Sequence, residues 1–355
     1  MKLNRTPSRT IIKSNLTPAV YNSFQPTGFP DIKASRFVIP GSNQENLLVE
    51  SPQSIANRLE ATVWDAAKQG LHSIFIGLPY VRLVNKATGA YIASSLSLPH
   101  RLASAYISKN KDPFSKRLID DLNSIGVAAA TFKYCPNSLL HGCFYSHVEE
   151  GKHKALRLVG GRIDAFDIAP VVTGGAVKDP ISASGKDFDL TAIIDSKVEG
   201  GDDRASKAGA GNIIHYAEEF VAKRIEAAFF IDDELIAALP LEECVKSLLK
   251  AIACWKIYTF LQSDLRLRSN CILDVVDDPE VIGIVPPLEE LEQEIPDLIS
   301  QCAAQELFAK PAVTEIALDL KLKPKPPTTT TTKPKRDKKN QSEAEIEQGQ
   351  LEVEA

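Results

Sequence analysis

The chain has 355 residues, of which 44% are hydrophobic and 25% charged, a composition typical of a globular protein with a sizeable core. No apolar run reaches the roughly 20 residues of a membrane-spanning helix, so we expect no membrane partner. The polar, basic N-terminus lacks the apolar stretch of a secretory signal. Six irregularly spaced cysteines predict reduced thiols, and the composition as a whole predicts a cytoplasmic protein.

The net charge of −5 is unevenly distributed along the chain. Residues 1–118 carry 15 Lys and Arg against 6 Asp and Glu, whereas residues 277–306 carry 9 Asp and Glu and no Lys or Arg. Because binding responds to the local field, a basic face for phosphate groups is compatible with the acidic total. The same basic region could instead pair with acidic surface elsewhere in the fold.

The first predicted elements form a strand–helix unit. Asn46–Glu50 is a short apolar run typical of a strand. Ser51 then supplies an N-cap, and Pro52 stands at the first helical position. Apolar residues recur at helical spacing as far as Ala66, which predicts an amphipathic helix over Ser51–Gln69.

The second half of the chain predicts long strands, a long helix and a final strand. The expected elements are strands at Ala155–Val172 and His215–Ile231, a helix at Leu241–Gln262, a strand at Arg266–Val276, and an acidic helical segment at Leu288–Leu307 interrupted at Pro296. Two β–α units joined by antiparallel strands predict an α+β sandwich of the ferredoxin or RNA-recognition type.

We expect one domain over residues 1–320, with insertions at about 70–150 and 174–212. The second insertion is rich in Gly, Asp and Lys, and insertions of this length are often functional. Residues 321–355 contain Pro-rich and Thr-repeat sequence with few large apolar residues, so they predict a disordered tail.

Several polar clusters are candidate binding sites for phosphate groups. Gln53, Asn57 and Arg58 lie in the first turns of the predicted helix, where amides and a guanidinium suit phosphate, sugar or base. His100 and Arg101 follow two serines, and Arg266 and Arg268 alternate with Leu267 and so share one face of a strand. From the pattern alone, an ordinary solvated polar face is the favoured explanation of the first cluster, and an exposed ion-pairing strand explains Arg266 and Arg268 equally well.

Metal and catalytic sites are weakly indicated. Cys135, His141, Cys143 and His147 could bind zinc, but their spacing is unlike the common zinc motifs and favours buried thiols and hydrogen-bonded histidines. The sequence contains no phosphate-binding loop, dinucleotide motif, metalloprotease motif or nucleophile elbow. We therefore expect no cofactor, no metal and no catalytic residue.

Eight motifs occur together in an order that resembles one CRISPR-associated family. They are QPTGFPDI (Gln25 to Ile32), LVESPQSIANRLE (Leu48 to Glu60), GLPYV (Gly77 to Val81), SSLSLPHRLASAYI (Ser94 to Ile107), CPNSLLHG (Cys135 to Gly142), GGAVKD (Gly174 to Asp179), GNIIHYAEEF (Gly211 to Phe220) and LRLRSNCIL (Leu265 to Leu273). The chain resembles the RAMP-superfamily backbone subunit of type I-G (formerly I-U) Cascade-type effector complexes, the Csb family, over about residues 20–280.

The resemblance implies a modified RNA-recognition-type palm with inserted helical and β-hairpin (thumb) subdomains. It implies partners: CRISPR guide RNA, target DNA through the guide, further copies of the chain and other effector-complex subunits. The guide contacts that it favours are Arg36, Gln53, Asn57, Arg58, His100, Arg101, Asn137, Lys178, Arg266 and Arg268. The alternative is a RAMP-type ribonuclease, for which Asp31 and His100 are the residues to test.

Overall fold

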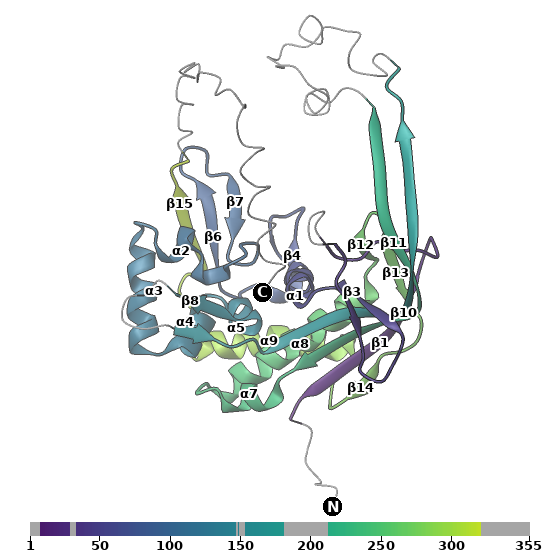
Figure 1. Cartoon of the computed structure of the whole chain (residues 1–355). Coiled ribbons are helices and arrows are strands. Elements are labelled where there is room, and N and C mark those ends of the chain that lie inside the picture. The colour runs from purple at the N-terminus through teal and green to yellow at the C-terminus, as the bar shows by residue number, and fades with distance from the viewer. Residues whose placement is uncertain (1–7, 29–32, 147, 149–152, 181–211, 321–355) are drawn as a thin grey trace, which may run out of the picture. The chain divides into compact units, whose positions relative to one another are not determined.

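The computed structural model describes residues 8–28, 33–146, 148, 153–180 and 212–320. By their internal contacts, residues 1–318 and residues 319–355 form two separate units. The predicted tail over 321–355 lies outside the described residues. The architecture is mixed α+β, with sheets that are mostly antiparallel (Figure 1). No helix in the described part combines the length and apolar character needed to cross a membrane.

The main sheet has eight strands drawn from both halves of the chain. Its order is β12-β13-β1-β11-β10-β3-β2, and β14 also pairs with β1. The strands are β1 (Thr10–Pro18), β2 (Arg36–Val38), β3 (Glu45–Glu50), β10 (Val159–Val177), β11 (Ile213–Ile231), β12 (Leu265–Arg268), β13 (Cys271–Val275) and β14 (Glu280–Ile282).

Helices cover one face of this sheet. α1 (Pro52–Ala61) packs on β10 and on α8 (Glu243–Gln262), and α8 packs on β11, α7 (Asp233–Ala238) and α9 (Leu288–Ala304). Side chains alternate along β1, where Ile12 and Leu16 point into the core. Phe229 of β11 meets Phe260 of α8 edge to face, with ring centroids 6.0 Å apart.

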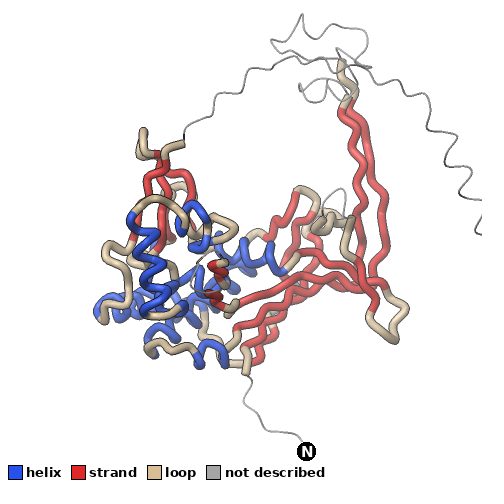
Figure 2. Tube along the Cα trace, turned by 60° about the vertical axis from the view of Figure 1, so that its left-hand side comes forward, coloured by secondary structure: helices blue, strands red, loops and turns tan. Residues whose placement is uncertain are grey.

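The insertion between α1 and β10 contains both helices and short strands, and Figure 2 shows most of the helices gathered there and beside the sheet. A C-terminal strand joins it: β15 pairs in parallel with β6, which the sequence did not predict. The elements are β4 (Trp64–Asp65), β5 (Gly70–Leu71), η1 (Ser73–Phe75), β6 (Tyr80–Asn85), β7 (Tyr91–Ser94), η2 (Arg101–Ala103), α2 (Ala105–Ser108), α3 (Pro113–Ser124), α4 (Val127–Tyr134), α5 (Pro136–His141), β8 (Cys143–Tyr145), β9 (His153–Ala155) and β15 (Val313–Leu318).

β10 and β11 form a hairpin that continues well beyond the rest of the sheet (Figure 1). Within the sheet, β10 pairs with β3 and β11 pairs with β1. From Ile168 to Val177, β10 pairs with β11 alone. On the β11 side, Phe220 forms a bridge with Phe24, Glu218 pairs with Arg36, and Glu219 accepts hydrogen bonds from Ser23 and Asn270. Asp167, at φ +55°, interrupts the ladder at the start of this outer part.

The first predicted helix is shorter than expected. It begins at Pro52, capped by Ser51, but ends at Ala61 instead of Gln69. The chain leaves the helix because Trp64 packs on the β6–β7 pair, where it stacks on Tyr91 at 5.4 Å and meets Tyr80 edge to face at 5.9 Å. Tertiary packing of one aromatic side chain therefore overrides the helical periodicity.

Two further expectations are wrong. The segment Arg266–Val276 is not one strand but the hairpin β12–β13, which has a register shift between Arg266 and Arg268, although burial along β12 still alternates, with Leu265 and Leu267 buried and the two arginines not. Pro296 does not interrupt α9, which is continuous over 17 residues. Leu291, Ile295 and Ile299 are buried by α8 and its neighbours, and this packing offsets the hydrogen bond lost at proline.

A close approach at Gly161 generates a stability prediction. A Cβ atom there would lie 2.4 Å from Cδ1 of Phe229 and 2.9 Å from the carbonyl oxygen of Ala228. Gly161→Ala should therefore lower the free energy of unfolding by about 1–3 kcal/mol, as overpacking does. Gly175→Ala, where nothing lies within 4 Å, is the matched control and should change it by less than about 0.5 kcal/mol. Urea denaturation of both variants checks this, and equal midpoints would contradict it.

Candidate nucleic-acid interface

Helix α1 presents the predicted interface residues on two different faces. Gln53 and Asn57 are exposed, whereas Arg58 is half-buried, and Ile55 and Leu59 are buried in the core. The Ser51 hydroxyl accepts a hydrogen bond from the Ser54 backbone N–H at 3.2 Å, which fixes the start of the helix. The two amides are therefore displayed on a rigid, capped helix.

Glu50, at the end of β3, organises the two predicted arginines Arg58 and Arg268. Its side chain is fully buried and accepts hydrogen bonds from the Ser54 hydroxyl and from both guanidinium groups, with Arg58 Nε at 2.9 Å. Arg58 also donates to the Leu267 carbonyl at 2.6 Å. Burial alone would raise the pKa of Glu50, but the bonds from Ser54 and the charges of Arg268 and Arg58 lower it.

A second buried carboxylate, Glu60 in the last turn of α1, holds two more predicted residues. Arg101 donates to both carboxylate oxygens at 2.7 Å, and Asn137 Nδ2 donates at 2.9 Å. Arg101 adopts φ +51°, an uncommon conformation for a residue with a side chain, and this two-pronged ion pair holds it there. Burial acts to lower the pKa of Arg101, but hydrogen bonds to Glu60 raise it.

Lys256 of α8 completes the cluster around Glu60. It is fully buried and donates to Asn137 Oδ1, and its Nζ lies 3.0 Å from His141 Nε2. Burial lowers the pKa of Lys256 to about 7, although the charge of Glu60 acts to raise it. Burial and then the charge of Lys256 hold the pKa of His141 well below its usual value, so His141 is neutral.

The remaining predicted residues are not brought to one place by these clusters. Arg36 pairs with Glu218 and Glu45 and lies over the Phe220 ring, 4.8 Å from its centroid. Three others are exposed in separate elements or loops: His100, Lys178 and Arg266. Of the ten predicted residues, four therefore belong to two buried carboxylate clusters, and the others lie at or near the surface.

The residues named for the alternative zinc and ribonuclease sites are only partly described. The Cys135 thiol accepts a hydrogen bond from Ser95, and burial raises its pKa, so the group is a thiol and not a thiolate. No cluster of metal ligands occurs among the described residues, which exclude His147. Asp31 also lies outside them.

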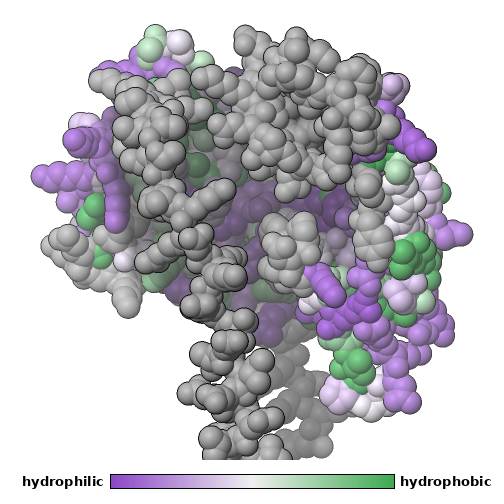
Figure 3. Space-filling model, turned by 45° about the horizontal axis from the view of Figure 1, so that its top comes forward, coloured by the Kyte–Doolittle hydropathy of each residue, from purple (hydrophilic) through white to green (hydrophobic). Residues whose placement is uncertain are grey.

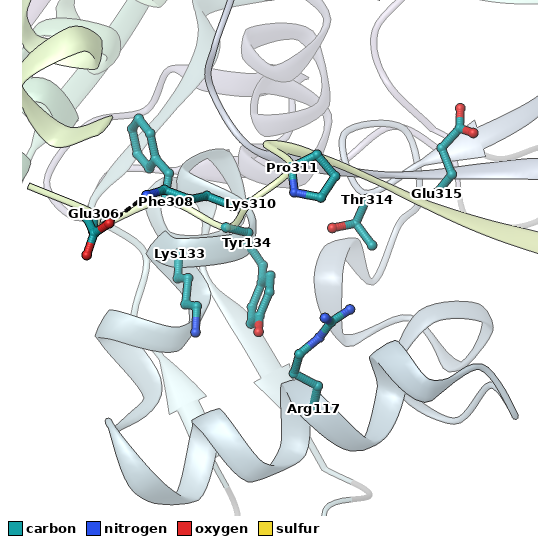
Figure 4. A pocket seen from close by; sticks show the side chains of 10 residues that line it. Arg117, Lys133, Tyr134, Glu306, Phe308, Lys310, Pro311, Thr314 and Glu315 are labelled. Atoms are coloured by element: carbon teal, nitrogen blue, oxygen red, sulfur yellow. Dashed lines mark hydrogen bonds and ion pairs between the residues drawn. The ribbon is translucent and has the colours of Figure 1, made fainter. Parts of the chain in front are cut away.

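Two pockets lie away from these clusters. One of about 530 Å³ is shared by α3, α4 and the segment before β15, and in Figure 4 Arg117, Tyr134 and Thr314 face it. The second, of about 720 Å³, is lined by residues of β1, β3, β10 and β11, among them Phe166 and Arg224. On the face drawn in Figure 3, apolar side chains form small separate groups within a mainly hydrophilic surface.

Sequence reasoning missed the residues that fix the interface. Glu50 ends the predicted strand Asn46–Glu50, Glu60 lies in the predicted helix Ser51–Gln69, and neither is predicted to be buried; Lys256 lies inside a long, largely apolar helix. A charged residue within an apolar run is the one available signal, because buried charges require partners. Apart from Arg58, which lies eight residues from Glu50, the arginine and asparagine partners of the two carboxylates lie more than forty residues away in the sequence.

The buried amine of Lys256 generates a pH prediction. The pKa of Lys256 in the folded protein, about 7, lies below the ordinary value of 10.5. Between these two pH values unfolding takes up a proton, so the free energy of unfolding of the wild type increases as the pH rises. In Lys256→Met this gain vanishes. From pH 7 to 9, the free energy of unfolding of the wild type should therefore rise relative to that of Lys256→Met, by up to about 1.4 kcal/mol per pH unit.

Chemical denaturation at several pH values measures this difference. Lys250→Met is the matched control on the same helix, because Lys250 reaches solvent and pairs with Asp233 at 2.9 Å. Parallel pH curves for wild type and Lys256→Met would contradict the prediction.

Comparison with known proteins gives one family match and two similar structures. Residues 10–170, less than half of the chain, match the model of the family described as CRISPR-associated protein GSU0053. Csc2 of Thermofilum pendens is 10% identical with a TM-score of 0.30, covering 85% of this chain and 81% of its own. A chain titled CRISPR RNA-guided surveillance complex, pre-nicking, is 12% identical with a TM-score of 0.35, covering 84% and 89%. No curated protein matches. Residues 10–170 are therefore similar to a CRISPR-associated family, as the motifs predicted.

Proposed function

We propose that the chain is a guide-RNA-binding backbone subunit of a type I-G Cascade-type effector complex, of the RAMP superfamily, and that it acts in the cytoplasm without catalysing a reaction. The observation that carries the proposal is the match of residues 10–170 to a CRISPR-associated family. That region contains α1 with its exposed Gln53 and Asn57. In this proposal, copies assemble along the guide, which pairs with target DNA.

The strand order supports a ferredoxin-like palm. Strands β13, β1, β11 and β10 lie side by side and pair antiparallel throughout. Taken in chain order, these four strands have the spatial order 4-1-3-2 of a split β-α-β fold, with α1 and α8 in the two crossovers. The outer β10–β11 hairpin is then the thumb, and Lys178 lies at its far end.

The exposed polar side chains are the best candidates for guide contacts. Gln53, Asn57, His100, Lys178 and Arg266 reach solvent and suit contacts with phosphate and sugar, which carry no sequence information. Buried carboxylates hold four other predicted residues, Arg58, Arg268, Arg101 and Asn137. These residues could contact RNA only through N–H groups that are not bonded to the carboxylates. Their main contribution in this proposal is to hold α1 in position.

Purification of the full chain from cells that express a CRISPR array tests the proposal. The expected result is copurification of small RNAs of uniform length with a repeat-derived end. A nucleic-acid-free monomer would contradict it. Guide RNA or target RNA cut by the purified chain, with cutting lost in His100→Ala or Asp31→Ala, would favour the ribonuclease instead.

Arg266→Gln tests one proposed phosphate contact without disturbing a buried cluster. The logarithm of the affinity for single-stranded RNA should fall less steeply with the logarithm of salt concentration, by about 0.7 in slope, because one counterion-releasing contact is lost. Arg117→Gln, an exposed change of equal charge on α3, is the control and should keep the wild-type slope. Fluorescence anisotropy measures both, and equal slopes for the two variants would remove Arg266 from the interface.

A further inference from the structure

Arg157, which precedes β10, is a half-buried arginine without a carboxylate partner among the described residues. Its Nη1 lies 3.5 Å from the carbonyl oxygen of Pro52, the first residue of α1, a distance at the limit of a hydrogen bond. The backbone of Arg157 packs closely on Gly142, where a Cβ atom would lie 3.2 Å from the Arg157 nitrogen. The guanidinium is therefore held beside the start of α1 by the fold.

The surroundings of Arg157 carry more positive than negative charge. Arg101 and Lys256 belong to the same neighbourhood, and the described carboxylate there is Glu60. Both oxygens of Glu60 already accept from Arg101, and one also accepts from Asn137. Glu50 is likewise occupied by Arg58 and Arg268. Glu60 thus balances Arg101, and Lys256 loses its charge at about pH 7, so Arg157 is the guanidinium of this neighbourhood that keeps its charge without a carboxylate partner among the described residues.

The pKa shifts of these groups reflect the cost of the uncompensated positive charge. Burial lowers the pKa of Arg157, and the charge of Arg101 lowers it further, although Glu60 acts in the opposite direction. Arg157 also helps to hold the pKa of His141 low. An unpaired, partly desolvated cation is costly to a fold, and a bound anion would remove the cost.

The position of Arg157 indicates which anion fits. The guanidinium fork matches the oxygens of a phosphate, and it lies at the start of the helix that displays Gln53 and Asn57 to solvent. We propose that Arg157 binds a phosphodiester of the guide RNA at the start of α1, beside the Glu60 cluster. This inference rests on the proposed function and assigns to it a contact that the sequence motifs did not indicate.

Affinity for a labelled single-stranded RNA oligonucleotide, measured by anisotropy at several salt concentrations, tests the assignment with the full chain. Arg157→Gln should weaken binding about tenfold and reduce the salt slope by about 0.7, since a charge-assisted phosphate contact is lost. Arg157→Lys should restore the slope, and Arg117→Gln should behave as wild type. Without RNA, Arg157→Gln should melt at the same temperature as wild type or higher, because an unbalanced charge is removed.

The outcomes separate the two proposals. An unchanged slope in Arg157→Gln, with wild type binding RNA, overturns the Arg157 site alone. If wild type binds no RNA, the proposed function fails, and a titration with tripolyphosphate tests the Arg157 site separately. Protection of wild type, but not of Arg157→Gln, against thermal unfolding supports the site. No protection of wild type overturns the site. Loss of self-association in sedimentation, with normal RNA affinity, would assign Arg157 to an acidic side chain of a second copy and also overturn it.

Discussion

Two buried carboxylates, one at each end of a single helix, hold the described fold together around α1. Glu50 immediately precedes the helix and Glu60 lies in its last turn, and both side chains are almost completely removed from solvent. Neither charge could remain there unpaired, because an isolated buried carboxylate costs several kcal/mol. Each therefore requires its arginine, and each arginine comes from a different part of the chain.

The two ion pairs connect α1 to the main sheet and to the insertion. Glu50 binds Arg268, which fastens the β12–β13 hairpin to the start of α1, and Glu60 binds Arg101, which fastens the insertion to its end. Lys256 then joins the insertion to α8 through Asn137 and His141. A helix fixed in this way presents Gln53 and Asn57 with little freedom, and in the proposed function this rigidity would lower the entropic cost of binding RNA.

Local features of the sequence could be predicted, and long-range ones could not. The start of α1 follows from Ser51 and Pro52 because capping involves neighbouring residues, and α8 follows from its continuous apolar character. The end of α1 depends on Trp64 reaching two tyrosines of another sheet, and the straight course of α9 through Pro296 depends on burial against α8. Of the four predicted binding residues that contact buried carboxylates, Arg101, Asn137 and Arg268 lie more than forty residues from their partners, and pairing over such a separation leaves no periodic signal. Arg58 lies eight residues from Glu50, across the boundary between a strand and a helix.

Because the outer β10–β11 hairpin is long, a small rotation at the bend at Asp167 would produce a large displacement of its far end. Its ten residues from Ile168 to Val177 extend about 33 Å at the usual rise of a strand, and the contacts of Glu218, Glu219 and Phe220 with neighbouring segments lie near the base of this length. A rotation of about 10° at the bend would displace the far end by roughly 6 Å. The backbone geometry of one aspartate, held through its N–H by Asn46 at 3.2 Å, thus sets the reach of Lys178.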